Sequence, residues 1–512
     1  MQVFELLEKI AARYPDRTAV SHDENHTTYA RLLEATNALA DRLSRLPSGP
    51  GARVALLFEN SVEYVEAFFA VFKSGRVAVP LDTSLTADGL KYILKDCQAE
   101  ALVCSSRFRR LLPKILDEDS TLRLIICDKN VKLAHKSISV ELLGDLVNAE
   151  TVTNDPPMTV DEGELAAIFY TSGSTGTSKG VMLSHRNLIS NTLATVEYLR
   201  LTENDSIMVI LPFYYIYGNS LLLTHMAAGG RVVIDNRFMY PEVILDTMEK
   251  EGVTGLSGVP SNFMILLGNS TFCKRKFPAL RYFTQAGGAM APEVIRQLMD
   301  AFPDKEVWIM YGQTEAAPRV TYLPPERLKE KLGSIGIPVP GVQITIVDEQ
   351  GQELPAGEVG EIMVTGPNVM LGYWNQAEEE KEVLRDGKLF TGDLARMDED
   401  GYFYVVGRRK EIIKVGGNRV SVKEIEECVL ENDKVLEAAV VGVPDPLLGE
   451  AVKLVVVLRP GCTAEPKEMQ VHCQRRLAPH KVPGIVTFAE SLPKLQTGKV
   501  NKLALKQLQP QR

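Results

Sequence analysis

The chain has 512 residues, of which 45% are hydrophobic and 24% charged, and its formal net charge at pH 7 is −9. This composition is typical of a soluble globular protein that is too long for one hydrophobic core, so it predicts at least two domains. The acidic balance disfavours wholesale binding to nucleic acid. No apolar run approaches the length of a membrane span, and the N-terminal stretch lacks the apolar centre of a signal peptide.

The seven cysteines are an odd number and form no CxxC or Cys/His cluster. Reduced thiols are therefore the expected state, and each cysteine is interpreted as a small core residue. Because thiols stay reduced in the cytosol, we expect a cytoplasmic protein.

Strand-like and helix-like segments alternate through the first three fifths of the chain. Residues 51–58 predict a strand, 61–75 an amphipathic helix that ends at a glycine, and 76–82 a second strand. Further buried strands are expected at 231–236 and 306–310. This succession indicates an α/β architecture with parallel sheets.

The sequence pattern changes at about residue 333. Short alternating strands with Gly and Pro turns, as in 342–366, predict a small antiparallel or barrel-like subdomain. After 401–410 another α/β stretch follows, and residues 408–512 carry 18 Lys and Arg against 12 Asp and Glu. Such a basic module indicates either solvated surface charge or a lid that brings cations to bound phosphates.

The stretch 168–185, IFYTSGSTGTSKGVMLSH, is rich in glycines and hydroxyls and has one lysine. Glycines let successive backbone N–H groups point into one concavity, which suits a polyphosphate. It is not a Walker loop, because Lys179 follows Ser178 where that pattern requires glycine. A buried strand precedes the loop and a helix at 187–196 follows it, which is where α/β sheets usually bind ligands. A flexible surface loop is the alternative.

Four other stretches carry groups suited to a nucleotide. Glu315, in YGQTE, could hold a hard cation through oxygen. Asp393 and Arg408 flank a turn and could meet ribose hydroxyls and phosphate oxygens. A glycine pair with flanking cations stands at 414–420, and Lys499 follows a Thr-Gly turn. Each of these charges, taken alone, could equally be surface charge.

Together, the motifs resemble those of the adenylate-forming (AMP-binding) superfamily of acyl- and aryl-CoA synthetases, nonribosomal-peptide adenylation domains and beetle luciferases. The matching segments, in the family's order, are YTSGSTGTSKGVMLSH, YGQTE, GSIGIPVPG, GEIMVTGPNVMLGYW, FTGDLA, GRRKEIIKVGGNRV and LPKLQTGKV. The resemblance spans nearly the whole chain. It implies an N-terminal domain at 1–407, made of two α/β subdomains and a barrel-like subdomain at about 333–407, and a small mobile α/β lid domain at 408–512.

The resemblance also implies roles for single residues. Those that would bind ATP or AMP are Thr171, Ser172, Gly173, Ser174, Thr175, Gly176, Thr177, Lys179, Gly288, Ala289, Tyr311, Gly312, Thr314, Asp393, Arg408 and Lys499. The catalytic set would be Thr314, Glu315 and Lys499, with Glu315 as the magnesium ligand and Lys499 stabilising the adenylation transition state. The thiol step would use Lys414, Gly416 and Gly417, and the hinge would be Lys410.

The acyl pocket is expected to involve Tyr214, Tyr215, Gly288 and Arg319. Many relatives carry His where Tyr215 stands, which leaves the usual gating role in doubt. The stretch 211–220 contains no acid, and this counts against an amino-acid substrate. Its tyrosines either line an aryl or medium-length acyl pocket or simply pack. Arg319 stands where relatives often have a small apolar residue; it could pair with a second carboxylate or a hydroxyl of the substrate, or point to solvent or a structural acid.

The expected activity is therefore that of an acyl-CoA synthetase, which forms acyl-AMP and pyrophosphate from an acid and ATP and then transfers the acyl group to CoA. ATP, Mg²⁺ and CoA are implied, with a medium-chain or aryl carboxylate favoured. The nearest alternative is an acyl-acyl-carrier-protein ligase that uses a pantetheine thiol. An ATPase or kinase using the same loop, or an inactive nucleotide-binding scaffold, is more distant. The sequence specifies neither the acid nor the oligomeric state, and it gives no sign of integral membrane association.

Overall fold

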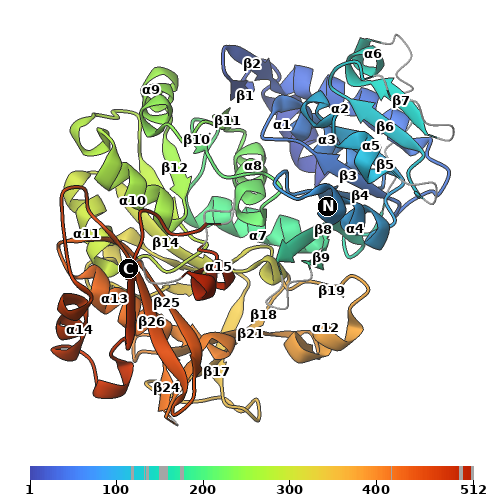
Figure 1. Ribbon diagram of the computed structural model, residues 1–512. Helices are drawn as coiled ribbons and strands as arrows, with labels where there is room; N and C mark the ends of the chain where they lie inside the picture. Colours follow the sequence, from blue (N-terminus) through green and yellow to red (C-terminus); the bar gives the residue numbers. More distant parts are fainter. Residues whose placement is uncertain are drawn as a thin grey trace.

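The computed structural model describes residues 1–512 except 117–119, 132, 134–137, 149–159, 173–177, 417, 495–499 and 509–512, and the side chains of Asn148, Ser172, Lys410 and Arg419 are also outside the description. The described strands form four sheets, and Figure 1 shows a large body with a smaller C-terminal part at its side. The predicted fold class, a large N-terminal α/β domain followed by a small C-terminal domain, is confirmed. No helix in the described part is long and apolar enough to cross a membrane.

The first large sheet has the strand order β19-β9-β8-β4-β3-β5-β6-β7. Its strands are β3 (Arg53–Leu57), β4 (Val77–Pro80), β5 (Ala101–Cys104), β6 (Leu124–Cys127), β7 (Ser139–Leu142), β8 (Leu165–Ser172), β9 (Ser178–Ser184) and β19 (Gly372–Tyr373). The accompanying helices are α2 (Tyr29–Ser44), α3 (Val62–Lys73), α4 (Ala87–Asp96), α5 (Leu112–Ile115) and α6 (Leu143–Asn148). The predicted strands at 51–58 and 76–82 and the helix at 61–75 are confirmed as β3, β4 and α3.

The second large sheet has the order β16-β15-β14-β13-β12-β10-β11-β1-β2. Its strands are β1 (Thr18–His22), β2 (Asn25–Thr28), β10 (Ser206–Val209), β11 (Arg231–Ile234), β12 (Gly255–Gly258), β13 (Tyr282–Gln285), β14 (Glu306–Gly312), β15 (Arg319–Leu323) and β16 (Ile337–Pro338). Strands β1 and β10 to β14 run parallel, and β15 returns antiparallel to β14. The strands predicted at 231–236 and 306–310 are confirmed as β11 and β14.

Helices pack around and between these sheets. They are α1 (Phe4–Arg13), α7 (His185–Tyr198), α8 (Ile216–Ala228), α9 (Pro241–Glu251), α10 (Pro260–Asn269) and α11 (Pro292–Ala301). Figure 1 shows α7 and α8 in the middle of the body, and one core cluster joins residues of both large sheets to α8. Because α8 is buried along nearly its whole length, its apolar residues are not confined to one face, and its polar residues Asn219, Ser220, Thr224 and His225 are also buried.

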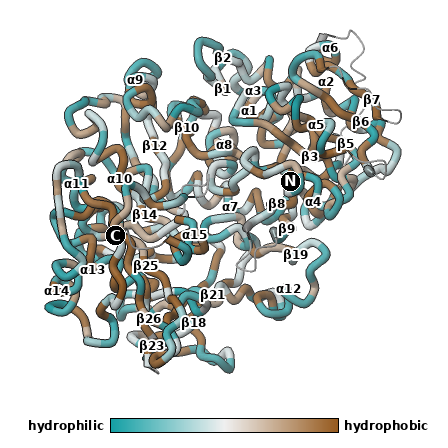
Figure 2. Tube along the Cα trace, viewed as in Figure 1, coloured by the Kyte–Doolittle hydropathy of each residue, from teal (hydrophilic) through white to brown (hydrophobic). Residues whose placement is uncertain are grey.

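The third sheet is antiparallel and half-barrel-like, as predicted for residues beyond 333. It contains β17 (Gln343–Val347), β18 (Gly360–Thr365), β20 (Leu384–Arg385), β21 (Lys388–Met397) and β22 (Phe403–Arg408), beside α12 (Ala377–Val383). The C-terminal sheet contains β23 (Ile413–Val415), β24 (Asn418–Val420), β25 (Val435–Asp445), β26 (Gly449–Leu458) and β27 (Ile485–Phe488), with α13 (Val422–Leu430), α14 (Pro466–Gln474) and α15 (Lys502–Gln507). Figure 2 shows hydrophobic residues along β25 and β26 and hydrophilic ones on the outer α14.

Candidate active site

The glycine- and hydroxyl-rich loop closes a β-hairpin, which corrects the expected order of strand, loop and helix. An additional strand, β9, begins at Ser178 and pairs antiparallel with β8, so that Thr171 stands opposite Lys179. The strand forms because the apolar run Val181–Leu183 is mostly buried against the core before α7 begins. Residues 173–177, all five of which are proposed phosphate-binding positions, lie outside the described residues.

Lys179, Tyr373 and Glu315 form one cluster beside this hairpin. The short strand β19 pairs with β9 and sets Tyr373 opposite Val181, two residues from Lys179. The Lys179 ammonium lies 5.2 Å from the centre of the Tyr373 ring, and the Tyr373 hydroxyl donates to Oε1 of Glu315 at 2.7 Å. Burial, followed by the charge of Glu315, raises the pKa of Tyr373, so its hydroxyl remains a donor.

Tyr311, Asp393 and Arg408 form a second cluster. Strands β21 and β22 pair Asp393 directly with Arg408, whose Nε lies 2.8 Å from Oδ1 of the carboxylate. The Tyr311 hydroxyl donates to Oδ2 at 2.6 Å. The Asp393 side chain is only 3% exposed, whereas that of Arg408 is 54% exposed and covers it. Asp393 raises the pKa of the Arg408 guanidinium, and burial followed by Asp393 raises that of Tyr311.

The segment 311–315 joins the two clusters at the carboxyl end of β14. Tyr311 contributes to one cluster, and the 3₁₀ turn Thr314–Ala316 carries Glu315 to the other. Thr314 is 8% exposed at the start of this turn. A Cβ at Gly312 would lie 1.8 Å from the carbonyl oxygen of Pro318, so only glycine allows β15 to pass this closely. The carboxyl end of a parallel strand is where α/β sheets usually bind ligands.

Gly288 and Ala289 follow the neighbouring strand β13 and are exposed. Gln285, the last residue of β13, donates from Nε2 to the carbonyl oxygen of Gly288 at 2.8 Å and holds this turn. The turn therefore lies beside the same edge of the sheet as Tyr311, with Pro260 at 3.4 Å from the place of a Cβ at Gly288.

The predicted acyl-pocket tyrosines lie around the start of α8. Tyr214 is buried, with its hydroxyl interacting with Asp82, while Tyr215 is the residue before the helix and its ring contacts that of Tyr217 at 6.5 Å. Arg319, the first residue of β15, is 2% exposed and lies with its guanidinium carbon 5.4 Å from the centre of the Tyr217 ring. Arg319 therefore does not point to solvent.

Two residues predicted for the thiol step, Lys414 and Gly416, lie on or directly after β23 of the C-terminal sheet. Lys414 is exposed and donates its backbone N–H to Glu450 at 2.8 Å, and Gly416 turns the chain with a φ of +54°. Figure 1 shows this end of the sheet, marked by β24, at the lower edge of the molecule and α15 nearer its middle. Gly417 and Lys499 lie outside the described residues, as does the side chain of Lys410 in the 3₁₀ turn Arg409–Glu411.

A metal ion would have a single carboxylate here. Among the described residues no group of three or more His, Cys, Asp or Glu could hold a metal. Glu315 nevertheless fits Mg²⁺, which proteins often bind through one or two carboxylates together with substrate phosphates. Only Oε1 of Glu315 accepts the bond from Tyr373, so the second oxygen can serve as a ligand.

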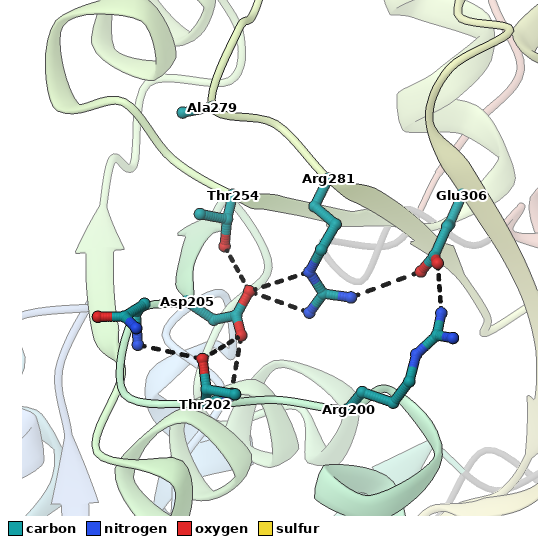
Figure 3. Close-up of a pocket in the computed structure, with 8 residues that line it drawn as sticks. Arg200, Thr202, Asp205, Thr254, Ala279, Arg281 and Glu306 are labelled. Atoms are coloured by element: carbon teal, nitrogen blue, oxygen red, sulfur yellow. Dashed lines mark hydrogen bonds and ion pairs between the residues drawn. The ribbon is translucent and has the colours of Figure 1, made fainter.

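A pocket at the amino-terminal ends of strands in the second sheet is lined by residues that form a chain of ion pairs (Figure 3). Asp205 accepts from Arg281 at 2.9 Å, Arg281 lies 3.4 Å from Glu306, and Glu306 pairs with Arg200. These residues stand next to the amino ends of β10, β13 and β14, away from Tyr311. We interpret the chain as a structural tie between strands, since each of its charges is paired.

The chain belongs to the AMP-binding enzyme family, whose model matches residues 7–374, while the model of the AMP-binding enzyme C-terminal domain matches 424–499. It is 34% identical to a long-chain-fatty-acid–CoA ligase of Yersinia pestis, over 98% of this chain and 94% of that one. It is also 34% identical to a feruloyl-CoA synthase of Amycolatopsis, over 95% of each. The structure of an anthranilate CoA ligase with anthranoyl-AMP superposes with a TM-score of 0.91 at 25% identity, over 99% of this chain and 96% of that one. The protein is thus an AMP-forming acid–thiol ligase, an acyl-CoA synthetase.

Tyr373 belongs to the site but was assigned no role from the sequence. It stands in the family-like segment MLGYW, but its partner Glu315 lies 58 positions earlier, and the fold brings the two together, with the Met370 N–H donating to the Glu315 carbonyl at 2.9 Å. The segment MLGYW could have indicated Tyr373 from the sequence, whereas its contact with Glu315 is visible only in the folded structure.

Proposed function

We propose that this protein activates a carboxylic acid with ATP and transfers the acyl group to CoA in a reducing, cytoplasmic compartment. An oxygen of the acid attacks the α-phosphorus, the bond to pyrophosphate breaks, and acyl-AMP forms. The sulfur of CoA then attacks the acyl carbon, AMP leaves, and the thiol proton passes to solvent. The observation that carries this proposal is the segment 311–315, which links Asp393 and Arg408 on one side to Glu315, Tyr373 and Lys179 on the other.

In this proposal the cluster of Tyr311, Asp393 and Arg408 binds the nucleoside. Each oxygen of Asp393 already accepts one bond and keeps a lone pair, so the carboxylate can still accept the two ribose hydroxyls. Because Asp393 is covered by the more exposed Arg408, the guanidinium has to move aside and can then meet ribose or phosphate oxygens. Tyr311 forms one wall of the adenine site. Gly312 follows it at the end of β14, and Gly288 and Ala289 lie on the turn after the neighbouring strand β13.

The cluster of Lys179, Tyr373 and Glu315 binds the phosphates. The residues assigned to this role are Thr171, Ser172, Gly173, Ser174, Thr175, Gly176, Thr177, Lys179 and Thr314. Lys179 is held over the face of Tyr373, so its charge is positioned before ATP arrives. Glu315 would hold Mg²⁺, whose chemistry there is neutralisation of phosphate charge. Lys499 supplies the positive charge at the α-phosphate, where charge develops in the transition state.

The acceptor and the acid are tested by one assay of pyrophosphate and thioester formation. A panel of medium-chain and aryl carboxylates is supplied with ATP and Mg²⁺, with CoA or with a pantetheine-bearing carrier protein. We expect acid-dependent pyrophosphate and AMP, and a thioester with CoA. Thioester formation with the carrier protein alone would identify a carrier-protein ligase, and acid-independent release of orthophosphate would overturn the proposal in favour of an ATPase.

A further inference from the structure

Arg319 is a buried cation that has no anionic partner among the residues the structure describes. Its residue exposure is 2%, and neither Nη1 nor Nη2 has a hydrogen-bond partner among the described residues. Among the described residues, the only hydrogen bond of the Arg319 side chain runs from Nε to the sulfur of Met310 at 3.4 Å. Buried charges are normally paired, because removing them from water is costly unless a partner compensates. The two free nitrogens are therefore available to a group that the chain itself does not supply.

The backbone of Arg319 is fixed from both sides. Asn191, on α7, accepts the Arg319 N–H at 3.2 Å and donates to its carbonyl oxygen at 2.6 Å. Asn368 donates to the same carbonyl at 3.3 Å. Because β15 also passes Gly312 without room for a Cβ, the start of the strand cannot shift far. The fold thus holds the base of this unpaired side chain firmly inside the protein.

The side chain lies next to the predicted acyl pocket. Met310 immediately precedes Tyr311 of the nucleotide cluster, and the Tyr217 ring beneath the guanidinium adjoins the ring of Tyr215 at the start of α8. Arg319 therefore lies between α8 and the strand β14, whose carboxyl end carries the nucleotide cluster, and within one ring of Tyr215.

The walls around Arg319 are polar but carry no anion to neutralise it. The Tyr217 hydroxyl donates to Thr284, and His225 pairs with Tyr282 at 3.0 Å. Burial lowers the pKa of His225 to about 4, so it is neutral at pH 7. The acid nearest in this network, Asp205, is already paired with Arg281 (Figure 3). A long apolar chain would fit such walls poorly and would leave the guanidinium charge buried without a partner.

We propose that Arg319 binds a second carboxylate at the far end of the substrate, so that the preferred acids are dicarboxylates. One carboxylate meets ATP and the other forms a paired, two-hydrogen-bond contact with Nη1 and Nη2, the geometry that guanidinium and carboxylate favour. This inference rests on the proposed function, because it assigns the substrate class of the same adenylation site.

The test measures acid-dependent pyrophosphate release by the full chain. Straight-chain and aromatic dicarboxylic acids are compared with their monomethyl esters and with monocarboxylic acids of equal length. The wild type should favour a dicarboxylate over its ester by about 100-fold or more in kcat/KM, the scale of leaving a buried charge unpaired. Arg319→Met should remove this preference while monocarboxylates remain substrates, and Arg319→Lys should retain part of it.

Thermal unfolding without substrate separates this role from a structural one. Because no described group pairs with Arg319, Arg319→Met should leave the Tm unchanged or raise it. The matched control is Arg76→Met: Arg76 is 1% exposed but donates to the carbonyl oxygens of Ser44 and Leu46. That variant should lower the Tm and leave the choice of acid unchanged.

The outcomes distinguish this inference from the proposed function. Equal activity with a dicarboxylate, its ester and the matching monocarboxylate overturns the role of Arg319 and leaves the ligase intact. A fall in Tm for Arg319→Met with unchanged acid preference also overturns it and makes Arg319 structural. Absence of pyrophosphate release with every acid overturns the proposed function itself, and the inference with it.

Discussion

Tyr373 connects the two charged residues of the proposed phosphate-binding cluster, since its ring faces Lys179 and its hydroxyl donates to Glu315. Tyr373→Phe keeps the ring and removes only the hydrogen bond. We expect kcat/KM for MgATP to fall about 10-fold, the scale of one hydrogen bond to a charged group, and the Mg²⁺ concentration for half-maximal activity to rise. Steady-state pyrophosphate release at varied Mg²⁺ measures both.

The control is Tyr322→Phe on β15. Tyr322 stacks on Tyr198 with ring centres 4.1 Å apart, and its hydroxyl makes no side-chain hydrogen bond within the described part of the chain. This variant should match the wild type in Mg²⁺ dependence. If Tyr373→Phe behaves in the same way as Tyr322→Phe, Glu315 does not depend on Tyr373, and the cluster has no part in metal binding.

The residues around Tyr215 predict that amino acids are poor substrates. The stretch 211–220 has no acid to pair with an α-ammonium, and Arg319 nearby is itself a cation. Burying an uncompensated ammonium there would cost several kcal/mol. Pyrophosphate exchange with the common amino acids should therefore stay near the level without acid, while the preferred carboxylate gives robust exchange. Strong exchange with any amino acid would contradict this account of the pocket.

Single residues differ in how far the sequence predicted them. The pairing of Asp393 with Arg408 follows the expectation from FTGDLA and GRRKEIIK, because a hairpin brings neighbours in sequence together. The burial of Arg319 could not be predicted from the sequence. Solvent, a structural acid and a substrate group were all possible partners for its side chain, since its exposure depends on α7 and α8, which lie about 100 positions earlier in the chain.

At the scale of elements, the passage of β15 beside β14 holds segment 311–315 in place. Gly312→Ala would place a Cβ 1.8 Å from the Pro318 carbonyl, which forces the strands apart. We expect a loss of stability of about 3 kcal/mol or more, and a loss of activity because Tyr311 and Glu315 are displaced. Thermal unfolding and pyrophosphate release measure the two effects.

Gly144→Ala is the matched control for this substitution. Gly144 lies in α6 and a Cβ there meets nothing within 4 Å, so alanine should be neutral or slightly stabilising. If Gly312→Ala is as well tolerated as Gly144→Ala, the close approach of the strands is not needed to position the site.

His225 joins α8 to β13 and makes this contact dependent on pH. Its ring bonds the Leu221 carbonyl at 2.9 Å and the Tyr282 hydroxyl at 3.0 Å, and burial lowers its pKa from 6.5 to about 4. A depressed histidine pKa means that the unfolded chain takes up the proton first, so this contribution to stability is present above pH 6.5 and is lost as the pH falls towards 4. Between pH 7 and 5 the loss is about 2 kcal/mol.

The test compares the wild type with His225→Gln, which cannot titrate. The difference in unfolding free energy between the two proteins should shrink by this amount from pH 7 to 5, as measured by denaturant unfolding at each pH. Glu66 has a pKa raised to about 8 by burial and opposes the effect in both proteins, so only the difference isolates His225. A constant difference across this range would show that His225 has the same pKa in the folded and unfolded chains, so that burial does not lower it.

Elements near one another in sequence were predictable, whereas those built from distant pieces were not. The periodicity of 51–82 sufficed for β3, α3 and β4, because each segment buries an apolar face of its own. Strand β9 was missed because its short apolar run, Val181–Leu183, directly adjoins α7 in sequence. The two-residue strand β19 gains its pairing only from β9, so no local pattern could have indicated it.

At the scale of the whole molecule, the small C-terminal domain presents two different ends. The hairpin with Lys414 and Gly416 lies at its outer end, and α15, which begins three positions after Lys499, lies nearer the middle of the molecule (Figure 1). The domain contacts the body through Lys423, whose ammonium donates to the carbonyl of Val405 at 2.6 Å. We propose that this domain rotates between the two half-reactions, with only a few residues near Lys410 changing φ and ψ.

This rotation predicts that the two half-reactions separate by mutation. Lys499→Ala should slow acyl-AMP formation about 100-fold or more, the scale of losing transition-state charge stabilisation, and should largely spare thioester formation from supplied acyl-AMP. Gly417→Leu should do the reverse, since a side chain at this position would obstruct the approach of the thiol. Each half-reaction is assayed alone, with pyrophosphate release for the first and AMP release from acyl-AMP and CoA for the second. If both variants slow both halves equally, a single fixed arrangement performs the whole reaction and the hinge near Lys410 has no catalytic role.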